Sequence, residues 1–242
     1  MKGLKALLTG FELLLTPGLK RFVLVPVLVN LAVFVLLMVT LLGWLGGWVV
    51  LAQDFLPGWL DWLAWLIQPL AFVFALILFV FGFTVLNGFI AAPFYGVLAE
   101  KVELHLDPAA VIPSETLGSM ISRTLLRELS KWLWYVPRAL VLLAISLVPV
   151  INLISPLLWL GFGAWVMTIE YRDYLNDNHG HDLALTRQQA WAEPLDSGMF
   201  GLLVLMLVSI PLVNLLVPSA AVAGATAWGV SQRIHPDRIV RS

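Results

Sequence analysis

The chain has 242 residues, of which 60% are hydrophobic and 12% are charged, and its mean hydropathy is +0.93. Soluble domains carry about twice that charged fraction and lack several apolar runs near twenty residues, so this composition is typical of a membrane protein. The formal net charge of -1 argues against a nucleic-acid partner, and the lack of cysteine excludes disulfides, thiol catalysis and cysteine metal sites.

The first predicted element is an amphipathic helix over residues 2–15. Its apolar side chains recur at three- and four-residue spacing, which predicts a helix that lies in the membrane interface. The apolar positions are Leu4, Leu7, Leu8, Phe11, Leu14 and Leu15. No small-residue cleavage site follows the segment, so we expect it to be retained and not removed as a signal peptide.

The loop that follows combines a predicted helix start with two cations. Thr16 suits an N-cap and Pro17 suits the first helical position. The next three backbone amides would then be free beside two positive side chains, which is the physical description of an anion site. The candidate site consists of Gly18, Leu19, Lys20 and Arg21. Together with the preceding helix it forms the first predicted segment, residues 1–21. The alternative is that the two cations only flank a membrane segment and fix its orientation.

Two long segments without any charged residue come next. Both exceed the roughly twenty residues that cross a hydrocarbon core ~30 Å thick. We therefore predict transmembrane helices over residues 22–52 and 69–99, joined by a periplasmic loop over 53–68. That loop has tryptophans and two aspartates but no Lys or Arg, as expected for the outer face. Asn87, in the second span, is either an interhelical hydrogen-bonding residue or part of a pore lining.

Residues 100–134 return to the side that holds most of the positive charge. We expect polar, partly amphipathic cytoplasmic helices there. Four charged residues in this region have two alternative interpretations, a solvated ion-pair network or a charged gate near a pore mouth. They are Glu100, Glu103, Arg127 and Glu128.

Two later apolar regions contain an internal repeat. The pattern VPVINLISP at residues 148–156 returns as IPLVNLLVP at residues 210–218. Each arm around these motifs is about ten to fifteen residues long, roughly half of a membrane crossing. We therefore predict two half-penetrating helical hairpins, over residues 135–170 and 198–230.

Charge sidedness agrees with hairpins at both places. With a cytoplasmic segment over 171–197 and a cytoplasmic tail over 231–242, all 14 Lys and Arg residues lie on one side. Fully spanning hairpins would keep this sidedness and differ only in arm length. Single crossings would place Arg172 and Arg187 outside, against the positive-inside tendency.

The apices place polar groups within the apolar regions. Asn152 and Asn214 either satisfy backbone groups released by the prolines or face a hydrated path. The second arm of each hairpin should begin near Pro156 or Pro218, so that its free amides favour an anion.

The chain resembles the CysZ family of bacterial inner-membrane sulfate transporters. The resemblance covers nearly the whole chain and is carried by the two apices and by three further motifs. These are LLLTPGLKR (13–21), NGFIAAPFYGVLAEKVE (87–103) and GAWVMTIEYRDYLNDNHG (163–180). It implies sulfate uptake that supplies cysteine biosynthesis, two long membrane helices with two half-penetrating hairpins, and assembly into an oligomer.

The resemblance also implies that Gly18, Leu19, Lys20 and Arg21 form the sulfate site. Two arginines are usual in the family at the two basic positions. Lys20 departs from this pattern, because lysine offers a point charge where arginine offers a planar fork. Sulfite and related oxyanions remain alternative ligands.

The predicted fold class is an all-α integral membrane protein of the bacterial inner membrane, with both termini cytoplasmic. Two functions stay open, a sulfate channel or facilitator and a noncatalytic membrane scaffold associated with another transporter. We expect no enzyme and no cofactor, because the chain has no nucleotide-binding motif and no evident nucleophile and base. The segment 176–183 contains His179 and His181 near two aspartates, and we expect a turn there, not a metal site.

We also expect a homo-oligomer embedded in the lipid bilayer. Two complete spans are too few to enclose two hairpins and a hydrated path, so neighbouring subunits should supply the missing walls. Paired protomers could cover each other's hairpins. The close-approach faces would be lined by small residues such as Gly161, Gly163, Ala221, Ala223 and Ala225.

Overall fold

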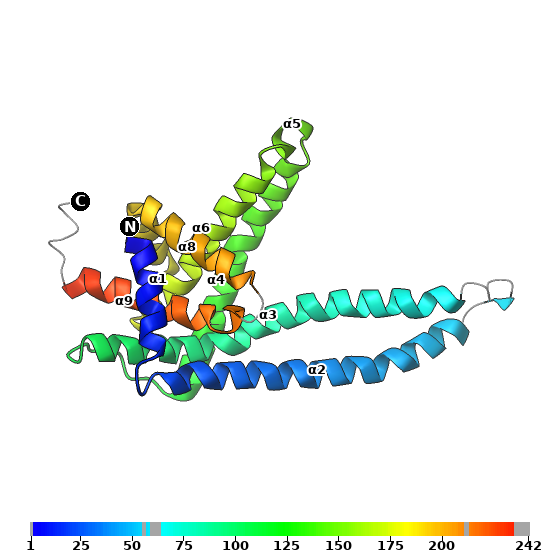
Figure 1. Ribbon diagram of the computed structural model, residues 1–242, viewed down its shortest axis with the longest axis horizontal. Coiled ribbons are helices and arrows are strands. Elements are labelled where there is room, and N and C mark those ends of the chain that lie inside the picture. Colours follow the sequence, from blue (N-terminus) through cyan, green and yellow to red (C-terminus); the bar gives the residue numbers. More distant parts are fainter. Residues whose placement is uncertain (1, 55–56, 59–63, 211–212, 235–242) are drawn as a thin grey trace. The chain divides into compact units, whose positions relative to one another are not determined.

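The computed structural model describes residues 2–54, 57–58, 64–210 and 213–234. These residues form helices and connecting turns without a strand, which confirms the prediction of an all-α protein (Figure 1). The helices in chain order are α1 (Lys2–Leu14), α2 (Lys20–Asp54), α3 (Ala64–Leu106), α4 (Leu117–Ser146), α5 (Pro149–Asn152), α6 (Ser155–Asn178), α7 (Leu183–Ala192), α8 (Pro194–Val208), the 3-10 helix η2 (Val213–Leu215) and α9 (Val217–Ile234).

The chain divides into two compact units. One is Pro26–Ala91, and the other combines Met1–Val25 with Ala92–Ser242. In the first unit the ring of Phe34 on α2 meets the ring of Phe79 on α3 edge-on, with centroids 5.1 Å apart. Helix α2 contains a stretch, Leu31–Leu51, that is long and apolar enough to cross a membrane.

Helix α3 covers the second predicted span but is longer than expected. It runs unbroken from Ala64 to Leu106, past the predicted boundary at residue 99. Its described apolar side chains include the stretch Pro69–Phe79. By length and composition, the described helices include one that could span a membrane, or two if the bent pair α7 and α8 counts as one span.

The second unit is built around close contacts of α1 with α8 and α9. Glycines let the backbones meet: a Cβ atom on Gly3 would collide with the carbonyl oxygen of Asp196, and one on Gly10 would collide with that of Ala220. A Cβ atom on Gly224 of α9 would likewise strike the carbonyl oxygen of Ala6. Helix α1 is therefore locked into the protein by a stripe of small residues.

The face of α1 that packs inward overlaps only in part with the apolar face that was predicted to lie in the membrane interface. The buried residues are Gly3, Ala6, Leu7, Gly10, Leu13 and Leu14. From the predicted apolar face, Leu7 and Leu14 are buried, whereas Leu8 and Leu15 are 54% and 72% exposed. Hydrophobic periodicity did not reveal the true contact face, because glycine and alanine carry little apolar weight although they allow the closest approach.

The internal repeat is confirmed in the backbone of the two apices. Hairpin 1 consists of α4, α5 and α6, and hairpin 2 consists of α8, η2 and α9, with residues 211–212 outside the described chain. Equivalent amide-to-carbonyl bonds close both turns. The matching bonds are Asn152 to Val148 (2.9 Å) and Asn214 to Ile210 (3.0 Å), then Ile154 to Ile151 (3.0 Å) and Leu216 to Val213 (3.0 Å).

The second arms begin where the prolines predicted. Helix α6 starts at Ser155, directly before Pro156, and α9 starts at Val217, directly before Pro218. A proline is tolerated in the first turn of a helix because its missing N–H has no partner there.

The helices of hairpin 1 extend beyond the predicted membrane arms. Helix α4 has 30 residues and α6 has 24, against the expected ten to fifteen, and α4 runs unbroken through the predicted boundary at residue 135. Both helices continue beyond their apolar ends because their polar ends pair with each other, as described below. The tip of hairpin 1 is strongly exposed, with Leu147 at 78% and Leu153 at 85%.

Candidate functional site

The predicted anion loop is a turn, and α2 begins later than expected. The helix starts at Lys20, not at Pro17, so Thr16 is not its N-cap. The amide of Leu19 is not free, since it donates to the carbonyl of Thr16 at 3.2 Å. The amides without a helical acceptor are therefore those of Lys20 and the residues that follow it.

Gly18 and Leu19 set the shape of this loop. Gly18 has φ of 96°, in the left-handed region that favours glycine, and no heavy atom lies near its would-be Cβ. Leu19 is buried in the hydrophobic core and anchors the turn, while Lys20 is exposed. The structure thus brings Gly18, Leu19 and Lys20 together at the start of a long helix. The side chain of Arg21 lies outside the described residues.

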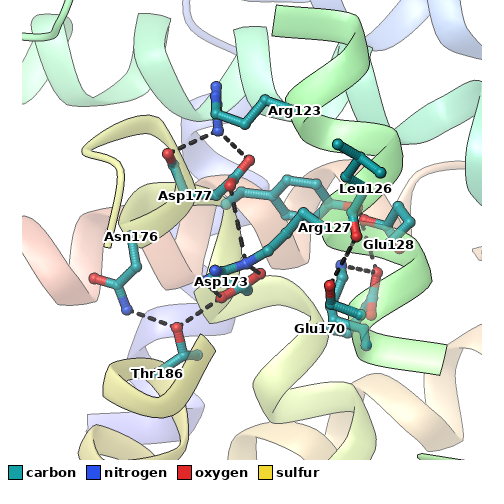
Figure 2. Close-up of polar contacts among 12 residues, drawn as sticks. Arg123, Leu126, Arg127, Glu128, Glu170, Asp173, Asn176, Asp177 and Thr186 are labelled. Atoms are coloured by element: carbon teal, nitrogen blue, oxygen red, sulfur yellow. Dashed lines mark hydrogen bonds and ion pairs between the residues drawn. The ribbon is translucent and has the colours of Figure 1, made fainter. Parts of the chain in front are cut away.

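The most extensive polar cluster joins α4 to α6 and α7 (Figure 2). Arg127 makes a two-pronged contact with Asp173, with Nε to Oδ2 at 2.8 Å and Nη2 to Oδ1 at 2.7 Å. Thr186 donates its hydroxyl to the same Asp173 Oδ1 at 2.7 Å and accepts from the amide of Asn176 at 2.9 Å. One buried aspartate therefore ties three helices together.

A second arginine extends the cluster toward solvent. Arg123 forms ion pairs with Asp177 and with Glu115, the latter at 2.6 Å, and it donates to the main-chain carbonyl of Asp177 at 2.7 Å. Burial raises the pKa of Asp177 above its usual range, against the lowering effect of Arg123. A cleft of about 480 Å³ opens beside these groups, with Ser119 and Ser122 in its lining.

The third part of the cluster holds one lysine between two glutamates. Lys131 is 1% exposed, and its Nζ lies 2.5 Å from Glu128 and 2.8 Å from Glu170. Burial, followed by the negative charge of Glu170, raises the pKa of Glu128 to about 8, although Lys131 opposes the shift. With one cation between two carboxylates, the site favours one bound proton near neutral pH.

The predicted gate residues do not form one site. Arg127 and Glu128 belong to the cluster described above. Glu103 is buried at the end of α3, where its carboxylate meets His179 Nε2 at 2.8 Å and Arg233 Nη1 at 2.9 Å. Glu100 pairs only with its neighbour Lys101, at 2.6 Å, among the contacts described for it.

The predicted pore asparagines have different outcomes. Asn152 and Asn214 lie at the hairpin tips and are exposed, and neither side chain has a hydrogen bond to a described residue. The interpretation that they satisfy freed backbone groups is therefore not observed within the described part of the chain. The side chain of Asn87 lies outside the described residues.

The histidine segment contacts charged side chains. His179 contacts Glu103 and lies 3.0 Å from Arg233 Nη1, and the rings of His179 and His181 stack at 6.2 Å. No group of three or more His, Asp or Glu side chains suited to a metal occurs within residues 2–54, 57–58, 64–210 and 213–234.

Sequence analysis did not identify most of the ion-pair partners in this cluster, although the spacing of the charged residues indicated them. Cations recur every four residues on α4, and carboxylates recur at three- and four-residue spacing on α6, so each set occupies one helix face. The two stripes are Arg123, Arg127 and Lys131 on α4, and Glu170, Asp173 and Asp177 on α6. In an antiparallel hairpin the two stripes pair in reverse order. Figure 2 shows this for Arg123 with Asp177 and for Arg127 with Asp173.

Known proteins resemble this chain over nearly its whole length. The family model described as "Sulfate transporter CysZ/Etoposide-induced protein 2.4" matches residues 6–218. A protein of Pseudomonas fluorescens (strain Pf0-1) named "Sulfate transporter CysZ" is 41% identical over 240 residues, which cover 96% of this chain and 94% of that protein. Proteins with the same name from Pseudomonas paraeruginosa (strain DSM 24068 / PA7) and Pseudomonas aeruginosa (strain LESB58) are 41% and 42% identical over 230 residues, with 92% of each chain covered.

Proposed function

Because the chain belongs to the sulfate transporter CysZ/etoposide-induced protein 2.4 family, we propose that it carries sulfate across the bacterial inner membrane. The observation that supports this most strongly is 41% identity over 96% of the chain with a relative named as a sulfate transporter. In this proposal the protein acts as a channel or facilitator and supplies sulfate for reduction and cysteine biosynthesis.

The membrane arrangement in this proposal follows the apolar surface. Helices α2 and α3 cross the bilayer, the apices of both hairpins enter it, and both termini lie in the cytoplasm. Support comes from Leu31–Leu51, which is long and apolar enough to span, and from the exposed leucines at the tip of hairpin 1. This arrangement keeps the positive charges on one side, as the positive-inside tendency favours.

Sulfate binds, in this proposal, at the turn before α2. The site consists of Gly18, Leu19, Lys20 and Arg21. A doubly charged oxyanion suits this position, because the first amides of a 35-residue helix point outward beside basic side chains. Lys20 has no ion pair with any described residue, so its charge is available to a ligand.

Polar groups farther along the chain line or gate the path. The candidates are Asn87, Glu100, Glu103, Arg127, Glu128, Asn152 and Asn214. Arg127 forms a bidentate ion pair with Asp173, so it can bind a passing anion only when that ion pair breaks. The excess carboxylate around Lys131 would repel sulfate when ionised, and a proton on Glu128 would remove that repulsion.

The transporting unit is a homo-oligomer. The apices leave exposed apolar side chains and few helical neighbours, and a single chain offers little to enclose a path for a strongly hydrated ion. Of the small residues expected at the subunit contacts, Gly161 on α6 remains open, since a Cβ atom there would meet no other group. A Cβ atom on Gly163 would strike the side chain of Leu205, and three alanines are buried within the protein itself: Ala221, Ala223 and Ala225.

Sulfate flux into proteoliposomes tests the proposal. Purified wild-type protein should admit labelled sulfate, and Arg21→Ala should weaken sulfate binding in calorimetric titration more than Lys20→Ala, because only arginine offers a planar fork. Lys5→Ala, which removes an exposed cation from α1, is the matched control and should bind normally. Absence of flux would refute the transport function, and unchanged affinity in Arg21→Ala would refute the loop as the site.

A further inference from the structure

Two arginines near the base of hairpin 1 lack the carboxylate partners that Arg123 and Arg127 have. They are Arg138 on α4 and Arg187 on α7, and neither forms an ion pair with a described residue. Both instead border one aromatic ring: their guanidinium carbons lie 3.8 and 5.3 Å from the ring centre of Trp134. Two positive charges are thus gathered around one indole, and neither is ion-paired with a carboxylate of the described residues.

The same place holds two buried donors without an acceptor. The indole Nε1 of Trp134 and the Nε of Arg187 are shielded from solvent and have no hydrogen-bond partner among the described residues. Buried donors are nearly always satisfied in proteins, so an acceptor is missing from this cluster. Two guanidinium groups and an indole N–H suit an anionic group with several oxygens, such as a phosphate or a sulfate.

The geometry is set by the surrounding helices and not by a ligand. Arg187 follows Thr186, whose hydroxyl binds Asp173 at 2.7 Å, and this contact holds α7 against α6. Arg138 is held by a bond from its Nη1 to the main-chain carbonyl of Trp134 at 2.8 Å. The cations are therefore positioned in advance, which reduces the entropy lost on binding.

The neighbouring surface indicates where the missing anion comes from. The rings of Trp165 and Trp191 are in contact in a tilted arrangement, with centres 4.2 Å apart, and Trp191 is 66% exposed. Tryptophans of this kind collect at the headgroup level of a membrane. Directly beyond Arg138 toward the apex, Leu140 and Val141 expose apolar side chains. The cluster thus lies where an aromatic layer meets the apolar arm of the hairpin.

We propose that Arg138, Arg187 and the Trp134 indole N–H bind the phosphate of an anionic phospholipid of the cytoplasmic leaflet. The lipid holds the base of hairpin 1 at the membrane surface, where the side chain of Arg138 is exposed to the headgroup layer. This inference rests on the membrane placement of hairpin 1 in the proposed function, but not on sulfate transport.

Lipid binding to the full-length protein tests it. Native mass spectrometry of the protein in mild detergent, titrated with phosphatidylglycerol or with phosphatidylcholine, should show preferential binding of the anionic lipid. The double variant Arg138→Gln/Arg187→Gln should lower the affinity for phosphatidylglycerol by about tenfold or more. Lys101→Gln, which removes one cation that is paired with Glu100, is the control for the loss of a basic residue elsewhere and should bind like the wild type.

Two further arms separate the alternatives. Trp134→Phe keeps an aromatic ring but removes the N–H donor together with the five-membered ring of the indole, so a loss of affinity there supports the site even if the double variant folds poorly. Equal phosphatidylglycerol affinity in the wild type and in either variant would overturn the proposal. Displacement of the lipid by inorganic sulfate, beyond the effect of chloride at equal ionic strength, would also overturn it, because the site would then take a soluble oxyanion. Sulfate flux measured in parallel keeps a failure of transport distinct from a failure of lipid binding.

Discussion

Replacing Lys131 by methionine should destabilise the protein strongly. Lys131 is almost completely buried and contacts Glu128 at 2.5 Å and Glu170 at 2.8 Å. Methionine fills a similar volume but leaves two neighbouring carboxylates without their cation. Breaking a buried ion pair from one side costs about 3–5 kcal/mol, so we expect a loss of that size above about pH 8.

The loss should depend on pH in a defined direction. The pKa of Glu128 is raised to about 8 in the folded protein, so between its ordinary value and about pH 8 the folded state holds a proton that the unfolded state releases. Stability therefore falls as the pH rises through this window. Without Lys131 the pKa of Glu128 should rise further, so the penalty of Lys131→Met is smaller near about pH 5, where only the contact with Glu170 is lost, and largest at alkaline pH.

Thermal unfolding followed by tryptophan fluorescence measures this effect. A loss of about 3–5 kcal/mol lowers the Tm by roughly 6–20 °C for a chain of this size. Glu128→Gln should flatten the pH dependence, and adding it to Lys131→Met should recover part of the loss, since Glu128 then carries no charge while Glu170 still lacks its cation. A Tm shift below about 2 °C at alkaline pH would show that Lys131 is solvated and would refute the buried cluster.

Three other outcomes can be measured. Gly10→Ala should destabilise the protein by about 1–3 kcal/mol because its Cβ would strike the backbone of α9, whereas Gly161→Ala should be neutral; equal Tm values for both would contradict the close packing. Asn152→Cys and Asn214→Cys should resist labelling from the periplasm while Gly58→Cys reacts, and fast labelling of both apices would instead support fully spanning hairpins. Mass measurement in nanodiscs should find an oligomer, and a fully active monomer would contradict the enclosure argument.

The helices and the repeat could be predicted from the sequence because they depend on local properties. An uncharged run such as residues 22–51 must satisfy its own backbone groups, so a continuous helix is the expected result. Likewise Pro156 and Pro218 start the second arms, since proline suits the first turn of a helix and disrupts its interior. The repeated motif predicted two apices, and both close with matching backbone bonds.

The details of the anion loop could be predicted only in part. Its residues were identified from Thr16 and Pro17, but the turn continues to Leu19 and α2 begins at Lys20. The helix begins later because Leu19 is buried in the hydrophobic core, where its neighbours include residues far away in the sequence. A local capping pattern contains no information about such contacts.

Composition and periodicity by themselves determined an all-helical chain with two repeated apices, because backbone hydrogen bonding and apolar runs are properties of neighbouring residues. Only the tertiary structure decided which charges meet. Arg127 binds Asp173, which is 46 positions away in the sequence. Arg138 and Arg187 instead contact the indole ring of Trp134 and form no ion pair with a described carboxylate. The physical reason is that the energy of a charge depends on its burial and its partners, and both are set by how helices pack and not by the residues beside it.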